Sequence, residues 1–156
     1  MSATPSPPTK RAEGTLLGLD FSLRHIGVAA ASTVTRVANP VTTINNPSGG
    51  GVNWDALTAL LQQWRPIAVI VGLPLTEDGG EQEETRAARR FGRRLHGRYG
   101  VQVYWQDERY TTRLAKDAGK NYHVPRHTNT LDAVAAQIIL QSWLDSTAQA
   151  TANGVQ

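Results

Sequence analysis

The chain has 156 residues, 40% of them hydrophobic, and 16 Lys and Arg against 13 Asp and Glu give a net charge of +3. This length allows one well-filled core and is too short for two ordinary domains. The lack of cysteine excludes disulfides, thiolate metal sites and cysteine nucleophiles. No apolar run reaches the roughly 20 residues of a membrane helix, so we expect a cytoplasmic protein with no membrane partner.

The first part of the chain predicts a leader and three strands. Residues 1–14 are Pro-rich without an apolar core, which favours a disordered leader over a secretory signal. Two apolar segments at 15–21 and 25–31, joined by a short polar turn, predict a hairpin. A looser alternation at 34–44 contains Pro40, which predicts a third strand that is kinked or at a sheet edge.

The middle of the chain alternates between helices and strands. Apolar residues at helical spacing predict a helix over 53–64. The continuous apolar run at 67–71 is typical of a strand buried on both faces, and a loop over 72–80 follows it. A helix over 81–98 begins with glutamates and continues with six arginines. A further strand is predicted at 101–105.

The last part of the chain predicts two more helices. One begins near Thr111 or Thr112 as N-cap, and the other covers 129–144, with a polar, basic loop over 117–128 between them. Residues 146–156 are rich in Ala, Thr, Gln and Asn and predict a flexible tail. The whole pattern indicates one α/β domain with a mixed sheet over 15–145.

Acidic residues fall where predicted apolar elements end or are interrupted. Asp20 lies between two apolar strands, Asp107 and Glu108 follow the last strand, and Asp132 lies in the first turn of the final helix. Ligand sites of α/β sheets gather beyond the carboxyl ends of the strands. Converging carboxylates repel one another unless a cation is present, and oxygen ligands suit Mg²⁺ or Mn²⁺. Two such ions about 4 Å apart are typical of phosphodiester cleavage.

Each acidic residue also has a simpler interpretation. Asp132 caps the final helix, Asp20 pairs with Arg24, and Asp107 and Glu108 are solvated. The spacing alone does not decide between these interpretations and a shared site.

Four linked motifs, in order over about residues 15–145, resemble the YqgF family of RNase H-like proteins, named as Holliday-junction resolvase-like or pre-16S rRNA nucleases. The motifs are Gly-Leu-Asp at 18–20 with Arg-His-Ile-Gly-Val-Ala at 24–29, Val-Gly-Leu-Pro-Leu at 71–75 with Asp-Gly at 78–79, Asp-Glu-Arg-Tyr-Thr-Thr at 107–112, and Asp-Ala-Val-Ala-Ala-Gln at 132–137, continuing to 144. The resemblance implies an RNase H-like fold, with a five-stranded mixed β-sheet flanked by α-helices.

The resemblance also implies three catalytic carboxylates that bind divalent metal. By motif these are Asp20, Glu108 and Asp132, with Asp107 as the alternative to Glu108, because both faces of the preceding strand look apolar. The family usually has Gly where this chain has Ser22, and a basic residue where it has Leu23. Serine lacks glycine's freedom to adopt positive φ, so we expect a strained turn or an altered approach of phosphate.

Basic residues supply candidate contacts to nucleic acid. Arg24, four residues after Asp20, is suited either to phosphate or to an internal salt bridge, and Arg109 follows the acidic pair. On the predicted helix over 81–98, four arginines cluster at steps of three and four residues; a charge run of this kind is also typical of a solvated face. They are Arg86, Arg90, Arg93 and Arg94. Further basic residues before Asp132 are Lys116, Lys120, His123, Arg126 and His127.

We therefore predict a nuclease, dependent on Mg²⁺ or Mn²⁺, that cleaves structured nucleic acid. Maturation of the small-subunit ribosomal RNA precursor at its 5′ end is favoured over cleavage of branched DNA such as Holliday junctions. A non-catalytic nucleic-acid-binding module in transcription or ribosome assembly is the alternative of a different class. A nucleotide-handling relative of the actin and sugar-kinase fold ranks last, because the chain is too short for two lobes. A homodimer is left open.

Overall fold

The computed structural model describes residues 13–109 and 130–152. The helices and strands in these ranges are β1 (Thr15–Phe21), β2 (His25–Ser32), β3 (Asn39–Asn45), α1 (Trp54–Trp64), β4 (Ala68–Leu73), α2 (Glu83–Tyr99), β5 (Gln102–Asp107) and α4 (Thr130–Ala152). Most of the predicted leader, the helix predicted near Thr111 or Thr112, the basic loop over 117–128 and the end of the tail lie outside the described residues.

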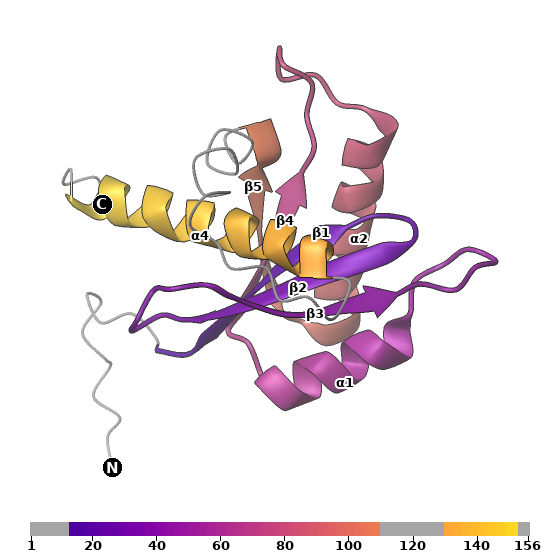
Figure 1. Cartoon of the computed structure of the whole chain (residues 1–156), viewed down its shortest axis with the longest axis horizontal. Helices are drawn as coiled ribbons and strands as arrows, with labels where there is room; N and C mark the ends of the chain where they lie inside the picture. Colours follow the sequence, from indigo (N-terminus) through magenta and orange to yellow (C-terminus); the bar gives the residue numbers. More distant parts are fainter. Residues whose placement is uncertain (1–12, 110–129, 153–156) are drawn as a thin grey trace.

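The strands of the described part form one five-stranded mixed sheet in the order β3-β2-β1-β4-β5 (Figure 1). The hairpin partners β1 and β2 are antiparallel, as are β2 and β3. Beyond β1, the strands β4 and β5 run parallel to it. The predicted mixed sheet is thus confirmed, and β1 is its central strand.

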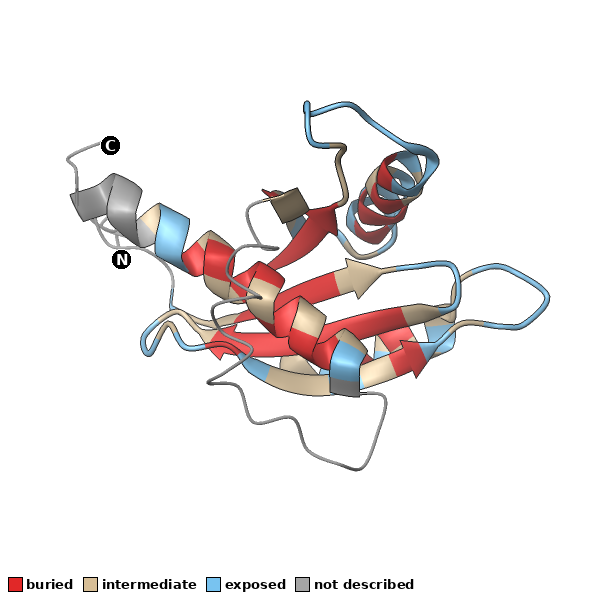
Figure 2. Ribbon diagram, turned by 45° about the horizontal axis from the view of Figure 1, so that its top comes forward, coloured by how far each residue is buried: buried red, intermediate tan, exposed pale blue. Residues whose placement is uncertain are grey.

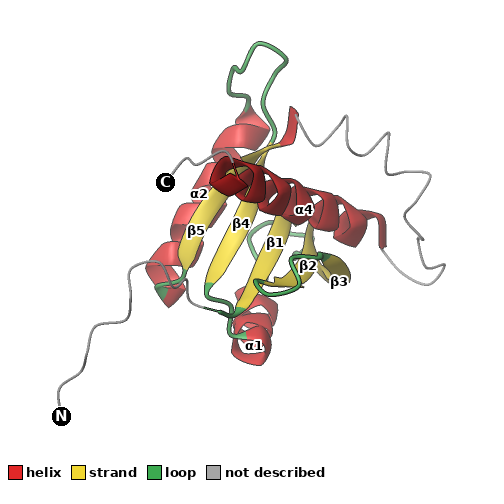
Figure 3. Ribbon diagram, turned by 90° about the vertical axis from the view of Figure 1, so that its left-hand side faces the viewer, coloured by secondary structure: helices red, strands yellow, loops and turns green. Residues whose placement is uncertain are grey.

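Helices cover both faces of the sheet. Figure 3 shows α4 across one face and α1 with α2 on the other. Alternate residues of each strand supply the two cores, so that Leu17 and Leu19 of β1 pack beneath α1 and α2, while Leu16 packs beneath α4. Figure 2 shows these strands buried where α4 crosses them. Both faces of β4 are buried, as its continuous apolar sequence predicts.

The third strand is shorter than predicted and lies at the sheet edge. It begins at Asn39 rather than at residue 34, because the chain first turns after β2 through Arg36, which has a φ of 57°. Pro40 pairs with Ala29 beside a register shift between Val28 and Ala29. The edge position predicted from Pro40 is confirmed, since proline has no N–H for a second neighbouring strand.

The final helix extends further than predicted, to Ala152 instead of 144. No Gly or Pro interrupts this stretch of the sequence, and the Ser142 hydroxyl donates to the Ile138 carbonyl within the helix at 2.7 Å. Arg36 donates to the Leu144 carbonyl at 2.6 Å, which ties α4 to the turn after β2. None of the helices in the described ranges has the length and hydropathy that crossing a membrane requires.

Candidate active site

Asp20 lies near the end of the central strand β1, on the face that α4 covers. Leu17 and Leu19 belong to the opposite core, so strand alternation directs Gly18 and Asp20 toward α4. A Cβ at Gly18 would lie only 2.7 Å from the Cβ of Leu140 in α4, which confirms this direction. The Asp20 side chain is therefore partly buried between the sheet and the helix.

Gly27 brings Asp132 to the side of Asp20. In the β1–β2 ladder, Gly27 is the direct partner of Asp20. A Cβ at Gly27 would lie 1.9 Å from the Asp132 carbonyl oxygen and 3.1 Å from the Asp132 Cβ. Only glycine leaves room for the first turn of α4 at this point. The Asp132 backbone thus lies directly against β2, the strand in which Gly27 pairs with Asp20.

Gly72 has the corresponding role on the other side of β1. Val71 pairs with Leu19 in the parallel ladder, so Gly72 comes level with Asp20. A Cβ at Gly72 would lie 3.0 Å from the Glu108 Oε2 atom. Glu108 follows β5 directly, and its carboxylate occupies the space that the missing side chain leaves. Two glycines in neighbouring strands therefore flank the Asp20 position.

Asp20 interacts electrostatically with the carboxylates of Asp132 and Glu108. Burial, and then the nearby Asp132 carboxylate, raise the pKa of Asp20 from 3.8 to about 6. Burial, followed by the charges of Asp20 and Asp107, raises the pKa of Glu108 from 4.5 to about 7. Negative charge is therefore costly at this site, and a cation placed among the carboxylates would relieve that cost.

The carboxylates approach one another without forming a complete ligand set. Among residues 13–109 and 130–152, no three acidic or histidine side chains are gathered closely enough to hold a metal ion together. The carboxylate oxygens nevertheless match the preference of Mg²⁺ and Mn²⁺ for oxygen ligands. A bound cation would also relieve the repulsion between the carboxylates.

Asp107 has different surroundings from Glu108. Val103 and Trp105 pack against the core beneath α2, and strand alternation continues this face to Asp107. The Asp107 carboxylate accepts hydrogen bonds from the Arg109 backbone N–H at 2.9 Å and from the Arg109 guanidinium at 2.5 Å. The hydrogen bond with the Arg109 side chain is the main reason that the pKa of Asp107 lies below its ordinary value.

Arg109 links this end of β5 to the loop that follows β4. Its Nη1 donates to the Glu77 carbonyl at 3.3 Å, and a Cβ at Gly79 would lie 3.2 Å from the same nitrogen. The loop closes on itself, because the Thr76 N–H donates to the Gly80 carbonyl at 3.0 Å. Arg109 was predicted to contact nucleic acid. In the structure, its guanidinium contacts Asp107 and the loop after β4.

The turn between β1 and β2 is well ordered by hydrogen bonds. The Ser22 N–H donates to the His25 carbonyl at 2.8 Å, and the Asn46 side chain donates to the Ser22 and Leu23 carbonyls at 3.2 Å each. Positive φ outside glycine occurs in the described residues only at Arg36 and Arg65. The strained turn expected from Ser22 is therefore wrong: serine fits the turn without positive φ.

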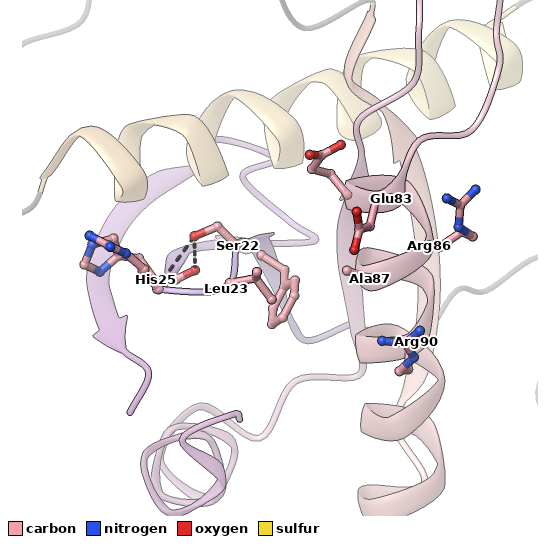
Figure 4. A pocket seen from close by; sticks show the side chains of 10 residues that line it. Ser22, Leu23, His25, Glu83, Arg86, Ala87 and Arg90 are labelled. Carbon is pink, nitrogen blue, oxygen red and sulfur yellow. Dashed lines mark hydrogen bonds between the residues drawn. The ribbon is translucent and has the colours of Figure 1, made fainter. Parts of the chain in front are cut away.

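A groove of about 710 Å³ separates this turn from α2. Arg24 lines it from the turn, and Arg86 and Arg90 line it from the helix; Figure 4 shows Leu23 and Ala87 on its two facing sides. The ion pairs in the described ranges join Arg89 to Glu81 and Arg109 to Asp107, so Arg24 does not pair with Asp20. The other two predicted arginines, Arg93 and Arg94, are exposed farther along α2, outside the groove lining.

Sequence reasoning from the residues alone did not single out Gly27, Gly72 or Asn46. A glycine inside an apolar strand often marks a close backbone approach, and this signal is present at Gly27 and Gly72. Asn46 follows a strand in an Asn-Pro-Ser-Gly loop, and its contact with the turn depends on the fold.

Comparisons with known proteins agree with this architecture. A family model described as "RuvX: Holliday junction resolvase" matches residues 14–146. A protein of Nitrosococcus oceani named "Putative pre-16S rRNA nuclease" is 47% identical over 92% of this chain and 95% of its own length. A protein of Saccharophagus degradans with the same name is 47% identical over 83% of this chain and 92% of its own.

Two solved structures share the fold at low sequence identity. Thermus thermophilus RuvC in complex with a Holliday junction has a TM-score of 0.58 at 17% identity, covering 86% of this chain and 96% of that one. The fowlpox virus Holliday junction resolvase has a TM-score of 0.52 at 12% identity, covering 85% and 99%. These likenesses confirm the predicted RNase H-like sheet. The family match and the close relatives over most of their lengths show that this chain belongs to the RuvX (YqgF) family.

Proposed function

We propose that this protein is a divalent-metal-dependent nuclease in which Asp20, Glu108 and Asp132 hold Mg²⁺ or Mn²⁺. The observation that carries the proposal is geometric: a Cβ at Gly27 would meet the Asp132 backbone, and a Cβ at Gly72 would lie 3.0 Å from the Glu108 Oε2 atom, so both acidic residues lie against the strands next to β1. The raised pKa of Asp20 and of Glu108, each caused in part by a neighbouring carboxylate, agrees with this arrangement. Repelling carboxylates at the ends of parallel strands are a typical arrangement for binding cations. The names of the relatives and of the matching family support the same class of enzyme.

In this proposal, different residues of the site bind the metal and the substrate. Divalent ions bound there, two in our proposal, would activate water and offset the charge that develops on the leaving oxygen. Arg24, Arg86 and Arg90 bind phosphates of the backbone across the groove. Arg109 acts through Asp107 and the Glu77 carbonyl, so it holds the loop after β4 beside the carboxylates rather than serving as a free cation.

We propose precursor small-subunit ribosomal RNA, cleaved at its 5′ end, as the substrate, because two relatives that are 47% identical to this chain are named "Putative pre-16S rRNA nuclease". The family description favours branched DNA as the second candidate. A third candidate is a nucleic-acid-binding module without catalysis, which the departure at Ser22 suggests. The ordered turn around Ser22 gives this third candidate no structural support.

A side-by-side assay separates the candidates. The purified protein is incubated with a precursor rRNA 5′ end and with a four-way DNA junction, in Mg²⁺, in Mn²⁺ and in EDTA. We expect metal-dependent cleavage that is faster on the RNA. Faster junction cleavage would assign the DNA activity, and tight RNA binding in EDTA without turnover in either metal would favour the binding module.

The two acidic residues after β5 provide a direct test of the assigned carboxylates. Glu108→Gln is expected to lower kcat at least about 100-fold, the size of effect that follows from losing a group that stabilises charge in the transition state. Asp107 contacts Arg109 rather than Asp20, so Asp107→Asn is expected to lower the cleavage rate by no more than about tenfold, the range of an indirect contact. Single-turnover cleavage rates measure both. A larger loss in Asp107→Asn would reverse the assignment.

The arginines of the groove are tested by salt dependence. The double change of Arg86 and Arg90 to Gln is expected to weaken RNA binding and to reduce the slope of log affinity against log salt by about 1.4, since each phosphate contact to a single strand contributes about 0.7. The matched control changes Arg93 and Arg94 to Gln on the same helix, outside the groove. Equal losses in both pairs would show that α2 attracts nucleic acid only by its overall charge.

A further inference from the structure

The β1–β2 turn stands between two grooves. The first is the groove of about 710 Å³ toward α2, and the second, of about 690 Å³, lies toward the loop between β3 and α1. Leu23, Arg24 and His25 line both grooves. The turn is therefore a ridge, and it begins two positions after Asp20 in the chain.

The first groove is suited to unpaired bases. Phe21, Leu23 and Ala87 give it an apolar lining, and the Phe21 ring is stacked on Phe91 at 4.4 Å, which fixes its position. The three arginines of the groove outnumber its two acidic residues, Glu83 and Glu84. An apolar surface beside arginines is the combination that binds single strands, with bases on the apolar side and phosphates on the cations.

The second groove has a different character. Besides the turn, its lining consists of amide, hydroxyl, proline and glycine residues from the end of β3 and the loop that follows it, and none of these lining residues is acidic. Asn45 contributes a side-chain contact of 3.0 Å between its Oδ1 and the His25 Nδ1. Short polar side chains and glycine backbone beside Arg24 are typical partners of phosphate and sugar groups.

Leu23 projects from the ridge between these two surfaces. Its exposed fraction is 76%, although the turn that carries it is held by the Asn46 side chain and by Ser22. An exposed apolar side chain on a rigid turn, with a cation beside it and a groove on each side, matches the wedges that proteins insert between bases.

We propose that Leu23 is a wedge that separates an unpaired strand in the first groove from a paired segment held in the second. The substrate class is then nucleic acid in which a duplex meets a single strand. This inference rests on the proposed nuclease function and names the form of substrate that the site selects. Leu23 lies three positions after Asp20, although none of the three proposed metal-binding carboxylates lines either groove.

The first test observes the wedge without cleavage. A hairpin RNA with a single-stranded 5′ tail carries 2-aminopurine at the last paired position, and binding is followed in EDTA. The native protein is expected to increase the fluorescence as the base unstacks, and Leu23→Ala is expected to remove most of this increase at saturating protein. Val34→Ala is the matched control, since Val34 is also exposed, at 67%, but lines neither groove.

The second test measures selectivity. Leu23→Ala is expected to lower kcat/KM about tenfold on the tailed hairpin, as the loss of a wedge contact predicts, and to leave an unpaired RNA of the same sequence within about twofold. Leu23→Met is expected to restore the selectivity. An unchanged fluorescence signal in Leu23→Ala would overturn the wedge while leaving the nuclease proposal intact. Lack of cleavage by the native protein would overturn the nuclease proposal, and the fluorescence test would still decide on the wedge.

Discussion

Asparagine in place of Asp20 is expected to abolish metal-dependent cleavage and, at pH 8, to stabilise the metal-free protein. The loss of cleavage follows from removing a carboxylate proposed to hold the metal, which is worth several kcal/mol in the transition state, or about 1,000-fold in rate. The gain in stability follows from the raised pKa of Asp20, since a carboxylate with such a pKa destabilises the fold when it ionises.

The direction of the pH dependence follows from proton binding. Because folding raises the pKa of Asp20 from 3.8 to about 6, the folded state binds more protons than the unfolded state across that interval, and stability falls as pH rises through it. The fall for this group is about 3 kcal/mol, because one pKa unit corresponds to about 1.4 kcal/mol, and it is complete by about pH 7. Glu108, whose pKa rises to about 7, extends the decline toward neutral pH.

Urea unfolding in EDTA at pH 4.5 and pH 8 measures this effect. We expect Asp20→Asn to be more stable than the native protein at pH 8, with a smaller difference at pH 4.5, and Mg²⁺ to stabilise the native protein more than the variant. Asp145→Asn is the control, because Asp145 is exposed and its Oδ1 contact with Gln141 survives the change. Full cleavage activity in a pure Asp20→Asn protein would contradict the proposed role.

Alanine in place of Gly27 is expected to cause a large loss of folding stability together with loss of cleavage. The new Cβ would lie 1.9 Å from the Asp132 carbonyl oxygen, and neither backbone can give way cheaply. The start of α4 must then move off β2, which costs about 3 kcal/mol or more by analogy with overpacked cores. The same movement carries Asp132 away from Asp20.

The matched control is Gly97→Ala, on the exposed side of α2, where a Cβ would meet nothing within 4 Å. This change is expected to stabilise the protein by up to about 1 kcal/mol, because alanine is the better helix former. Urea unfolding measures both variants. Equal stability of Gly27→Ala and the native protein would show that α4 does not need its close approach to β2.

Much of the fold could be predicted from hydrophobic periodicity. The apolar runs at β1, β2 and β4 were sufficient to predict the central strands, and Pro40 was sufficient to predict an edge. The end of α4 was predicted too early, because polar residues after Asp145 resemble a tail in sequence while they continue the helix in the structure. No local pattern could indicate that Arg36 binds the Leu144 carbonyl of this helix from more than 100 positions away.

The site was less predictable than the fold. The acidic residues could be named from their positions, but the choice between Asp107 and Glu108 depended on which face of β5 meets α2, and both faces look apolar. Similarly, the six arginines of α2 look alike in sequence, yet they have different surroundings in the structure. Arg86 and Arg90 line the groove. Arg89 instead forms an ion pair with Glu81, and its Cζ lies 5.7 Å from the centroid of the Trp105 ring. Such differences arise from packing partners distant in the chain.

The contact of Gly27 with Asp132 also has a consequence for biosynthesis. Residues 20 and 27 are made more than 100 positions before residue 132, and domains fold during synthesis from the N-terminal end. A nascent chain therefore lacks one of the three proposed carboxylates until residue 132 has been made. The proposed site therefore cannot form on a nascent chain that has not yet reached the start of α4.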